Sequence, residues 1–142
     1  MLNGKEFLEN WLHRVWSEED TTAIDELFLA DGKAKGLGSQ PLVGPADFKL
    51  FYAALCALLR DINISVDLCV QEGPWVSAVC RFCAQSQTSS EKVDITGSIM
   101  VRIEGGMIRE GYNHWDFMAM WEQLGLLPNE SFETGLMGNK IV

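Results

Sequence analysis

Apolar and polar residues alternate from residue 93 to residue 103, with an apolar residue or glycine at every second position. This period of two is typical of a β-strand that buries one face. The positions on that face are Val93, Ile95, Gly97, Ile99, Val101 and Ile103. Gly105 and Gly106 follow, and glycines that adopt positive φ close tight hairpins, so a second strand is predicted at about 107–114.

Two earlier apolar stretches predict further strands at about 62–71 and 75–87. The turns that join the four predicted strands are short, which suits antiparallel neighbours. A short helix is predicted at 117–124, ending at Gly125, and a tail follows Pro128.

The first part of the chain has helical spacing instead. Apolar residues recur three and four positions apart at Phe7, Leu8, Trp11, Leu12, Val15 and Trp16. Asn3 stands three residues before Glu6 and predicts the N-terminal cap of this helix. A second helix is expected at 22–29, before a turn at residues 31–32. A third begins at Gly44 and Pro45, because proline is favoured in the first turn.

Helices come first along the chain and strands afterwards, an order that indicates the α+β class. We expect three N-terminal helices packed on a strongly curved antiparallel sheet, forming a cone with an internal pocket. The length of 142 residues suits one domain, with a core at about 4–127 and a tail at 128–142.

Composition narrows the choice of partners. The formal charge is −9, from eleven basic and twenty acidic residues, which opposes binding to nucleic acid or to an anionic membrane. No apolar run approaches the roughly 20 residues that span a bilayer, and the opening segment has the pattern of an amphipathic helix, so a cytoplasmic protein is expected.

The four cysteines are expected to be free thiols in a reducing compartment: Cys56, Cys69, Cys80 and Cys83. Cys80 and Cys83 have the spacing of a redox or zinc motif, but strand residues three apart point to opposite faces. No phosphate-binding glycine loop, metal-ligand spacing or nucleophile elbow is present, so neither a cofactor nor a metal is expected.

Two segments carry a resemblance to a known family. The helix GPADFKLFYAALCALL (44–59) and the stretch ITGSIMVRIEGGMIREGYNHWDFMAMWEQLG (95–125), in this order of elements, resemble the SnoaL-like polyketide cyclase family. That family shares the cystatin-like α+β fold of nuclear transport factor two, ketosteroid isomerase and limonene epoxide hydrolase. The similarity covers most of residues 7–127.

The resemblance implies a catalytic carboxylate. In such cyclases an aspartate at the end of the last long strand acts as general acid and base in an intramolecular aldol closure, and Asp116 is the matching position. An apolar pocket would favour the protonated acid and suit this role. Asp116 also stands where a helix begins, and aspartate is a preferred N-cap. His114, two residues earlier, could exchange a proton with Asp116 or be a half-buried histidine that the backbone satisfies.

Further residues are candidates for substrate binding. Trp16, Phe51 and Trp115, with Phe117 beside them, could form aromatic walls for a planar ligand or could pack as ordinary core. Tyr112 shares the alternation of His114 and is expected on its face, unless a bulge intervenes. The guanidinium groups of Arg81 and Arg102 could bind a substrate carboxylate or pair with surface carboxylates. The predicted substrate-binding set is Trp16, Phe51, Tyr112, Arg102, Arg81 and Trp115.

The combined hypothesis is a protein that binds a small apolar or aromatic, polyketide-like molecule in the pocket. Acid and base chemistry of the aldol cyclase or isomerase type is expected at Asp116. One alternative is a non-catalytic ligand-binding or dimerisation module of the same fold, in which the outer sheet faces pair two copies. A homodimer is expected in either case. A third hypothesis is an epoxide hydrolase, which would need an aspartate two residues from an arginine. Cys83 follows Arg81 at that spacing, and Glu104 follows Arg102.

Overall fold

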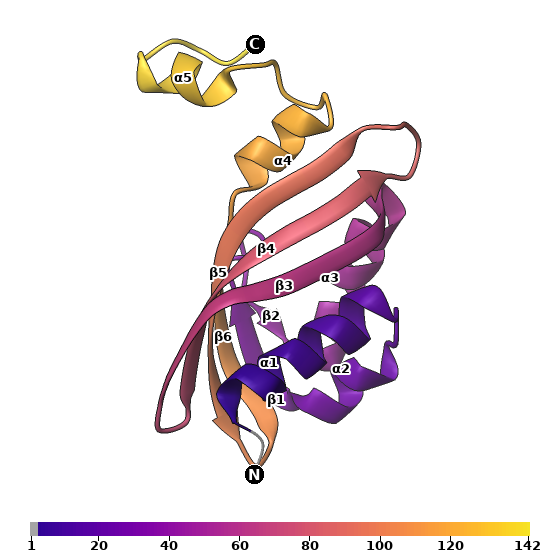
Figure 1. Cartoon of the computed structure of the whole chain (residues 1–142), viewed down its shortest axis with the longest axis vertical. Helices are drawn as coiled ribbons and strands as arrows, with labels where there is room; N and C mark the ends of the chain where they lie inside the picture. The colour runs from indigo at the N-terminus through magenta and orange to yellow at the C-terminus, as the bar shows by residue number, and fades with distance from the viewer. Residues whose placement is uncertain (1–2) are drawn as a thin grey trace.

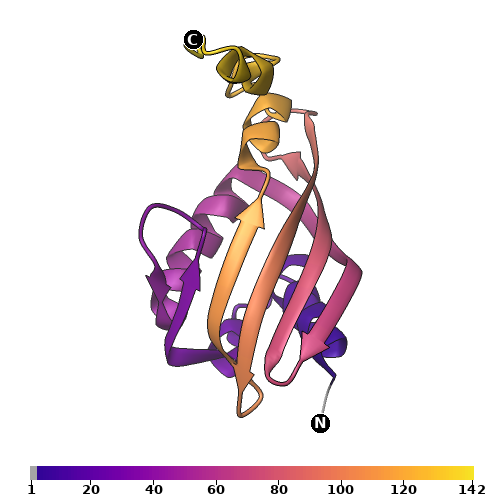
Figure 2. The same ribbon diagram turned by 90° about the vertical axis from the view of Figure 1, so that its left-hand side faces the viewer.

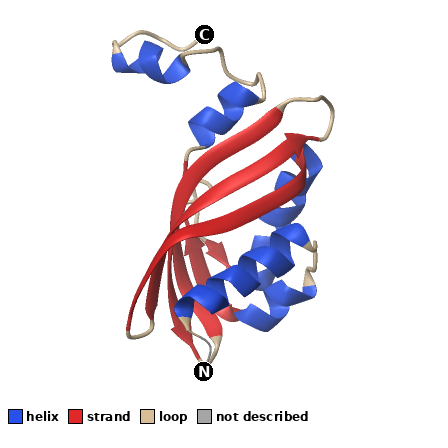
Figure 3. Ribbon diagram, in the orientation of Figure 1, coloured by secondary structure: helices blue, strands red, loops and turns tan. Residues whose placement is uncertain are grey.

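The computed structural model describes residues 3–142. Three N-terminal helices lie along the concave side of one curved sheet (Figure 1, Figure 3). In chain order the elements are α1 (Gly4–Leu12), the π-helical turn η1 (His13–Ser17), α2 (Thr22–Leu27), β1 (Phe28–Lys35), β2 (Leu42–Val43), α3 (Gly44–Leu58), β3 (Leu59–Glu72), β4 (Trp75–Ser86), β5 (Lys92–Glu104), β6 (Met107–Trp115), α4 (Phe117–Gln123) and α5 (Ser131–Leu136). The predicted α+β class is confirmed.

The sheet has six strands in the order β2-β1-β6-β5-β4-β3. Neighbours from β6 to β3 are antiparallel, as are β1 and β2, while β1 runs parallel to β6. The four long strands agree with the predicted ones to within a few residues. Figure 2 shows the broad outer face of this sheet, which none of the described N-terminal helices covers.

The helix predicted at 22–29 is present as α2 but ends at Leu27, whereas strand β1 was not predicted and replaces the turn expected at 31–32. Its pairing with β6 shifts in register between Phe28 and Lys33, so the regular alternation that marks a strand is absent. Gly32 lies in this irregular part, where an added Cβ would stand 3.0 Å from the carbonyl oxygen of Ile108. The close approach of β1 to β6 therefore depends on a residue without a side chain.

The predicted helical stripes supply much of the core. All six apolar residues of the first stripe are buried, and the predicted cap is present, since the amide of Glu6 donates to Asn3 Oδ1 at 2.8 Å. The last of those residues lie in η1 and not in a continued α-helix. In the third stripe Phe48, Tyr52 and Leu55 are buried, and Phe51 is half-buried.

The sheet separates two environments. On β4 the even-numbered side chains face the helices and are buried: Val76, Ala78, Cys80, Phe82 and Ala84. The odd-numbered ones face outward. Cys80 and Cys83 therefore lie on opposite faces as predicted, and all four cysteines are free. No helix within residues 3–142 is both long enough and apolar enough to cross a membrane.

The two C-terminal helices stand at one end of the sheet (Figure 1). Gln123 holds α4 against β5, because its side chain accepts from the amide of Asp94 at 2.8 Å and donates to the carbonyl of Asp94 at 3.0 Å. Glu122 Oε1 accepts from the amide of Ser131 at 2.5 Å and so anchors the start of α5. The first part of the tail after Pro128 is thus tied to α4.

Candidate ligand-binding site

An apolar cavity lies between the concave face of the sheet and the helices. About 610 Å³ of it is unoccupied by atoms, including space that opens to solvent, and about 50 Å³ is open to the centres of water-sized molecules. A single water needs roughly 10–15 Å³ of the space that is open to water centres, so the cavity has room for a few waters or a small organic group. The lining residues are Trp11, Leu12, Trp16, Phe28, Ala34, Leu37, Phe48, Phe51, Leu55, Ile64, Phe82, Ile95, Ile99, Val101, Ile108, Gly111, Asn113, Trp115, Phe117 and Met120.

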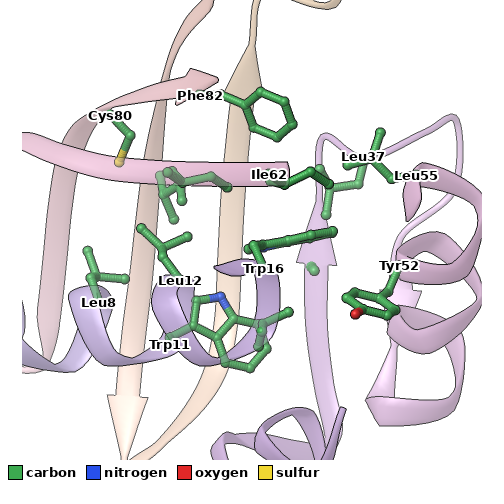
Figure 4. Close-up of a cluster of buried hydrophobic side chains, with 14 of the residues drawn as sticks. Leu8, Trp11, Leu12, Trp16, Leu37, Tyr52, Leu55, Ile62, Cys80 and Phe82 are labelled. Carbon is green, nitrogen blue, oxygen red and sulfur yellow. The ribbon is translucent and has the colours of Figure 1, made fainter. Parts of the chain in front are cut away.

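Aromatic side chains form two walls of this cavity. On the helix side Phe48 packs against both Trp11 and Trp16, with ring centroids 5.3 and 6.3 Å apart. On the sheet side Phe82 and Trp115 meet edge to face at 5.8 Å. Figure 4 shows the tryptophans of the helical wall and Phe82 of the sheet in the same cluster.

Polar groups are few in the lining. Asn113 contributes an amide, whose Nδ2 donates to the carbonyl oxygen of Lys35 at 3.0 Å and so ties β6 to β1. None of the lining residues carries a formal charge. Burial likewise disfavours anions in the core beside the cavity, where it raises the pKa of the Cys80 thiol to about 11 and also raises the pKa of Tyr52. The cavity is therefore suited to neutral ligands.

A glycine on β5 sets the position of one wall. Gly97 pairs with Trp115, and a Cβ added at Gly97 would stand 2.3 Å from Cε3 of that indole and 2.7 Å from the carbonyl oxygen of His114. The ring of Trp115 therefore lies directly across the backbone of β5. Glycine is required here by this close approach, since its φ is not in the left-handed region.

Comparison with known proteins identifies the family. The model of the SnoaL-like polyketide cyclase family matches residues 7–124. The chain belongs to that family. No curated protein matches.

Several solved structures have the same fold. IdmH from Streptomyces antibioticus is 18% identical, with a TM-score of 0.76 over 87% of this chain and 99% of that one. A SnoaL-like protein from Jannaschia sp. CCS1 is 17% identical, with a TM-score of 0.76 over 87% and 92% of the two chains. TsrD from Streptomyces laurentii is 16% identical, with a TM-score of 0.74 over 88% and 98%.

Three of the residues predicted for substrate binding in this SnoaL-like protein line the cavity: Trp16, Phe51 and Trp115. Phe117 lines it as well. Phe51, Trp115 and Phe117 are only half-buried, so they form the rim where the cavity meets solvent.

The other three predicted residues lie on the outer face of the sheet. Tyr112 is on the face of His114, as expected, and its ring is tilted against that of Trp75 with centroids 6.4 Å apart. Arg81 pairs with Asp94 at 2.5 Å, and Arg102 lies 3.4 Å from Glu110. Both arginines therefore pair with surface carboxylates, which was the alternative to binding a substrate carboxylate. Alternation explains the separation, because the inward positions of these strands are taken by apolar residues.

The predicted catalytic pair lies outside the cavity lining. Asp116 is exposed, and its Oδ1 accepts from the amide of Ala119 at 3.0 Å, so it caps α4. His114 is exposed opposite Ser98 on the outer face. Asp116 nevertheless directly follows Trp115 and precedes Phe117, which places its backbone at the cavity rim. Proton transfer at these residues stays a prediction.

Several lining residues were not chosen from the sequence, notably Trp11, Phe82 and Asn113. Val76, Ala78 and Cys80 occupy every second position of β4, and this alternation would have indicated that Phe82 faces the helices. Trp11 was recognised only as a core residue. Nothing in the local pattern distinguishes a cavity wall from a packed core, because both are apolar. Within residues 3–142, no three side chains of His, Cys, Asp or Glu gather as a metal site requires.

Proposed function

We propose that this SnoaL-like protein binds a small neutral apolar or aromatic molecule in the cavity. The observation that carries the proposal is the lining itself, which has aromatic walls on both sides and no charged side chain. Burial of aromatic surface is favourable by roughly 25 cal/mol per Å², and edge-to-face contacts with the walls add to it. A ligand larger than a few waters requires the rim residues to move apart.

Two leucines of α3 allow a matched test of binding. Leu55 is buried in the cavity lining, whereas Leu50 is exposed on the same helix. Leu55→Phe should fill part of the cavity, at a cost in stability of about 1–3 kcal/mol from overpacking. Leu50→Phe makes the same chemical change outside it.

The assay is thermal unfolding with and without naphthalene. A ligand present at ten times its Kd should stabilise the wild type and Leu50→Phe by about 1.4 kcal/mol, and should stabilise Leu55→Phe much less. Equal stabilisation of all three proteins would place naphthalene elsewhere. No stabilisation of the wild type by naphthalene or its ketone and phenol derivatives would refute the proposal.

Proton transfer at the rim is the second part of the proposal. Asp116 stands between two lining residues, so a substrate that reaches past Trp115 and Phe117 would meet its carboxylate. The reaction would be a proton abstraction next to a carbonyl, as in an aldol closure or an isomerisation. His114 could exchange a proton with Asp116 from the neighbouring position.

Asp116→Asn is the informative variant, because asparagine caps helices as well as aspartate does but cannot accept and return a proton. Solvent-deuterium exchange at the α-carbon of a bound aromatic ketone, followed by NMR, should slow by at least tenfold in the variant. His114→Gln tests the helper in the same assay. Exchange that is unchanged by Asp116→Asn would leave a non-catalytic binding protein.

The outer sheet face supports a proposal about assembly. Four large apolar side chains are exposed there: Leu68 and Val70 on β3, with exposed fractions of 68% and 71%, and Val79 and Met100, with 42% each. Trp75 and Tyr112 border them. Such a patch is unusual on a monomer surface, and a second copy of the chain would cover it across a two-fold axis.

Sedimentation equilibrium tests this homodimer. The wild type should have twice the mass of one chain, and Val79→Lys should shift it to the monomer. Val43→Lys is the control, because Val43 is similarly exposed, at 44%, but lies on β2 away from the patch. A monomeric wild type would contradict the proposal.

A further inference from the structure

The π-helical turn η1 has a specific effect on the cavity. In a regular α-helix Trp11 and Trp16 would be separated by about 140° around the axis, at 3.6 residues per turn. Residues His13–Ser17 form a wider turn instead, in which the amide of Glu18 donates to the carbonyl of His13 at 2.9 Å. Such turns are rare and recur at functional sites.

The wider turn brings both tryptophans to the same wall. Each packs against Phe48, and each lines the cavity (Figure 4). Trp16 also contacts Tyr52, with ring centroids 5.2 Å apart. Residues five apart on this segment therefore face one ligand volume, which the α-helical spacing alone would not produce.

The indole nitrogens of this pair have no acceptor among residues 3–142. Trp11 and Trp16 are only 5% and 6% exposed, yet no hydrogen bond of the described residues uses either Nε1. No side-chain nitrogen or oxygen in this part of the chain is both sealed off and unpaired, so each of the two indole nitrogens keeps some accessible surface. Both rings line the cavity, so a ligand there would lie beside the two tryptophans. Buried indole N–H groups usually have a partner, since an unmet donor is costly.

We propose that the N–H groups of Trp11 and Trp16 donate hydrogen bonds to a neutral carbonyl oxygen of the ligand. The cavity then selects an aromatic ketone over a hydrocarbon of the same shape. A carboxylate is disfavoured, because none of the lining residues carries a positive charge to offset its desolvation. This inference rests on the proposed binding of an aromatic ligand and names the group that orients it.

Acetophenone and ethylbenzene form a matched pair of probes, because they have similar size and only the ketone has an acceptor oxygen. Binding is measured by NMR on protein with ¹⁵N-labelled indoles, in which each of the five tryptophans gives its own N–H signal. Acetophenone should move the signals of Trp11 and Trp16 downfield, and ethylbenzene should not. Trp75, on the outer face, is the internal control for both probes.

Variants test the same contact by affinity. Trp11→Phe and Trp16→Phe keep an aromatic ring and remove the donor, so each should weaken acetophenone binding roughly three- to tenfold and leave ethylbenzene within about twofold. Trp75→Phe should change neither. Far-UV circular dichroism verifies that each variant is folded.

The possible results separate the two proposals. If both probes bind but neither the indole signals nor the Phe variants distinguish them, the donor role is refuted and ligand binding stands. If neither probe binds the wild type, the proposed function fails, and the donor role fails with it. The NMR experiment decides the question even when a variant does not fold.

Discussion

Replacing Gly97 by alanine should destabilise the protein by distorting the wall that Trp115 forms. The added Cβ would stand 2.3 Å from Cε3 of the indole and 2.7 Å from the carbonyl oxygen of His114. The ring can retreat only by losing its contact with Phe82, and the carbonyl belongs to the strand β6 that pairs with β5. Neither neighbour can therefore yield cheaply.

The magnitude follows from two opposing effects. Gly→Ala at an unstrained position stabilises by about 0.4–1 kcal/mol, because it reduces the freedom of the unfolded chain. Overpacking of this severity costs about 1–3 kcal/mol. We expect a net decrease of about 1–2 kcal/mol in the free energy of unfolding, measured by urea denaturation with circular dichroism and tryptophan fluorescence together.

Gly111 provides the matched control. It is also a strand glycine without positive φ, it lines the cavity, and an added Cβ would stand 3.5 Å from Val101 Cγ1, an ordinary contact. Gly111→Ala should therefore be neutral or stabilising by up to about 1 kcal/mol. Equal stability of the two variants would refute the claim that Trp115 is held against a bare backbone at Gly97. A displaced Trp115 should also weaken the binding of aromatic probes.

Three further predictions concern single groups. Asp116→Ala should lower stability by about 1 kcal/mol in urea denaturation, because it removes the α4 cap, whereas Asp116→Asn should be nearly neutral; equal losses would contradict the cap. The hydrogen bonds from Arg81 lower the pKa of Asp94, so this pair contributes stability above the unfolded value near ~3.9 and loses it as pH falls through the folded value. A pH series of urea midpoints should fall on the acid side, less steeply for Asp94→Asn; identical slopes would refute this. Cys80, buried and with its pKa raised to about 11, should react with a thiol reagent at pH 8 only as fast as the protein unfolds, and reaction before unfolding would count against its burial.

The local sequence pattern was sufficient to predict most of the helices and strands. The alternation at 93–103, the glycine pair before β6 and the helical stripe of Phe7 to Trp16 depend on short-range geometry, so they can be read from the residues themselves. β1 could not be read, because its register shift hides the alternation and its pairing with β6 joins segments about eighty residues apart. The π-turn was also invisible, since Trp11 to Trp16 has a pattern that fits an α-helix.

The candidate site shows the same division. The sequence by itself determined the family, the fold class and the likeness of Asp116 to the family's catalytic position, and it left the aromatic residues open as pocket walls or as core. Only the tertiary structure decided which face of the sheet is inside, and so placed Trp16, Phe51 and Trp115 at the cavity and Arg81, Arg102, Tyr112 and His114 outside it. The physical reason is that alternation assigns residues to two faces but does not say which face the helices cover. That choice depends on packing between segments far apart in the chain.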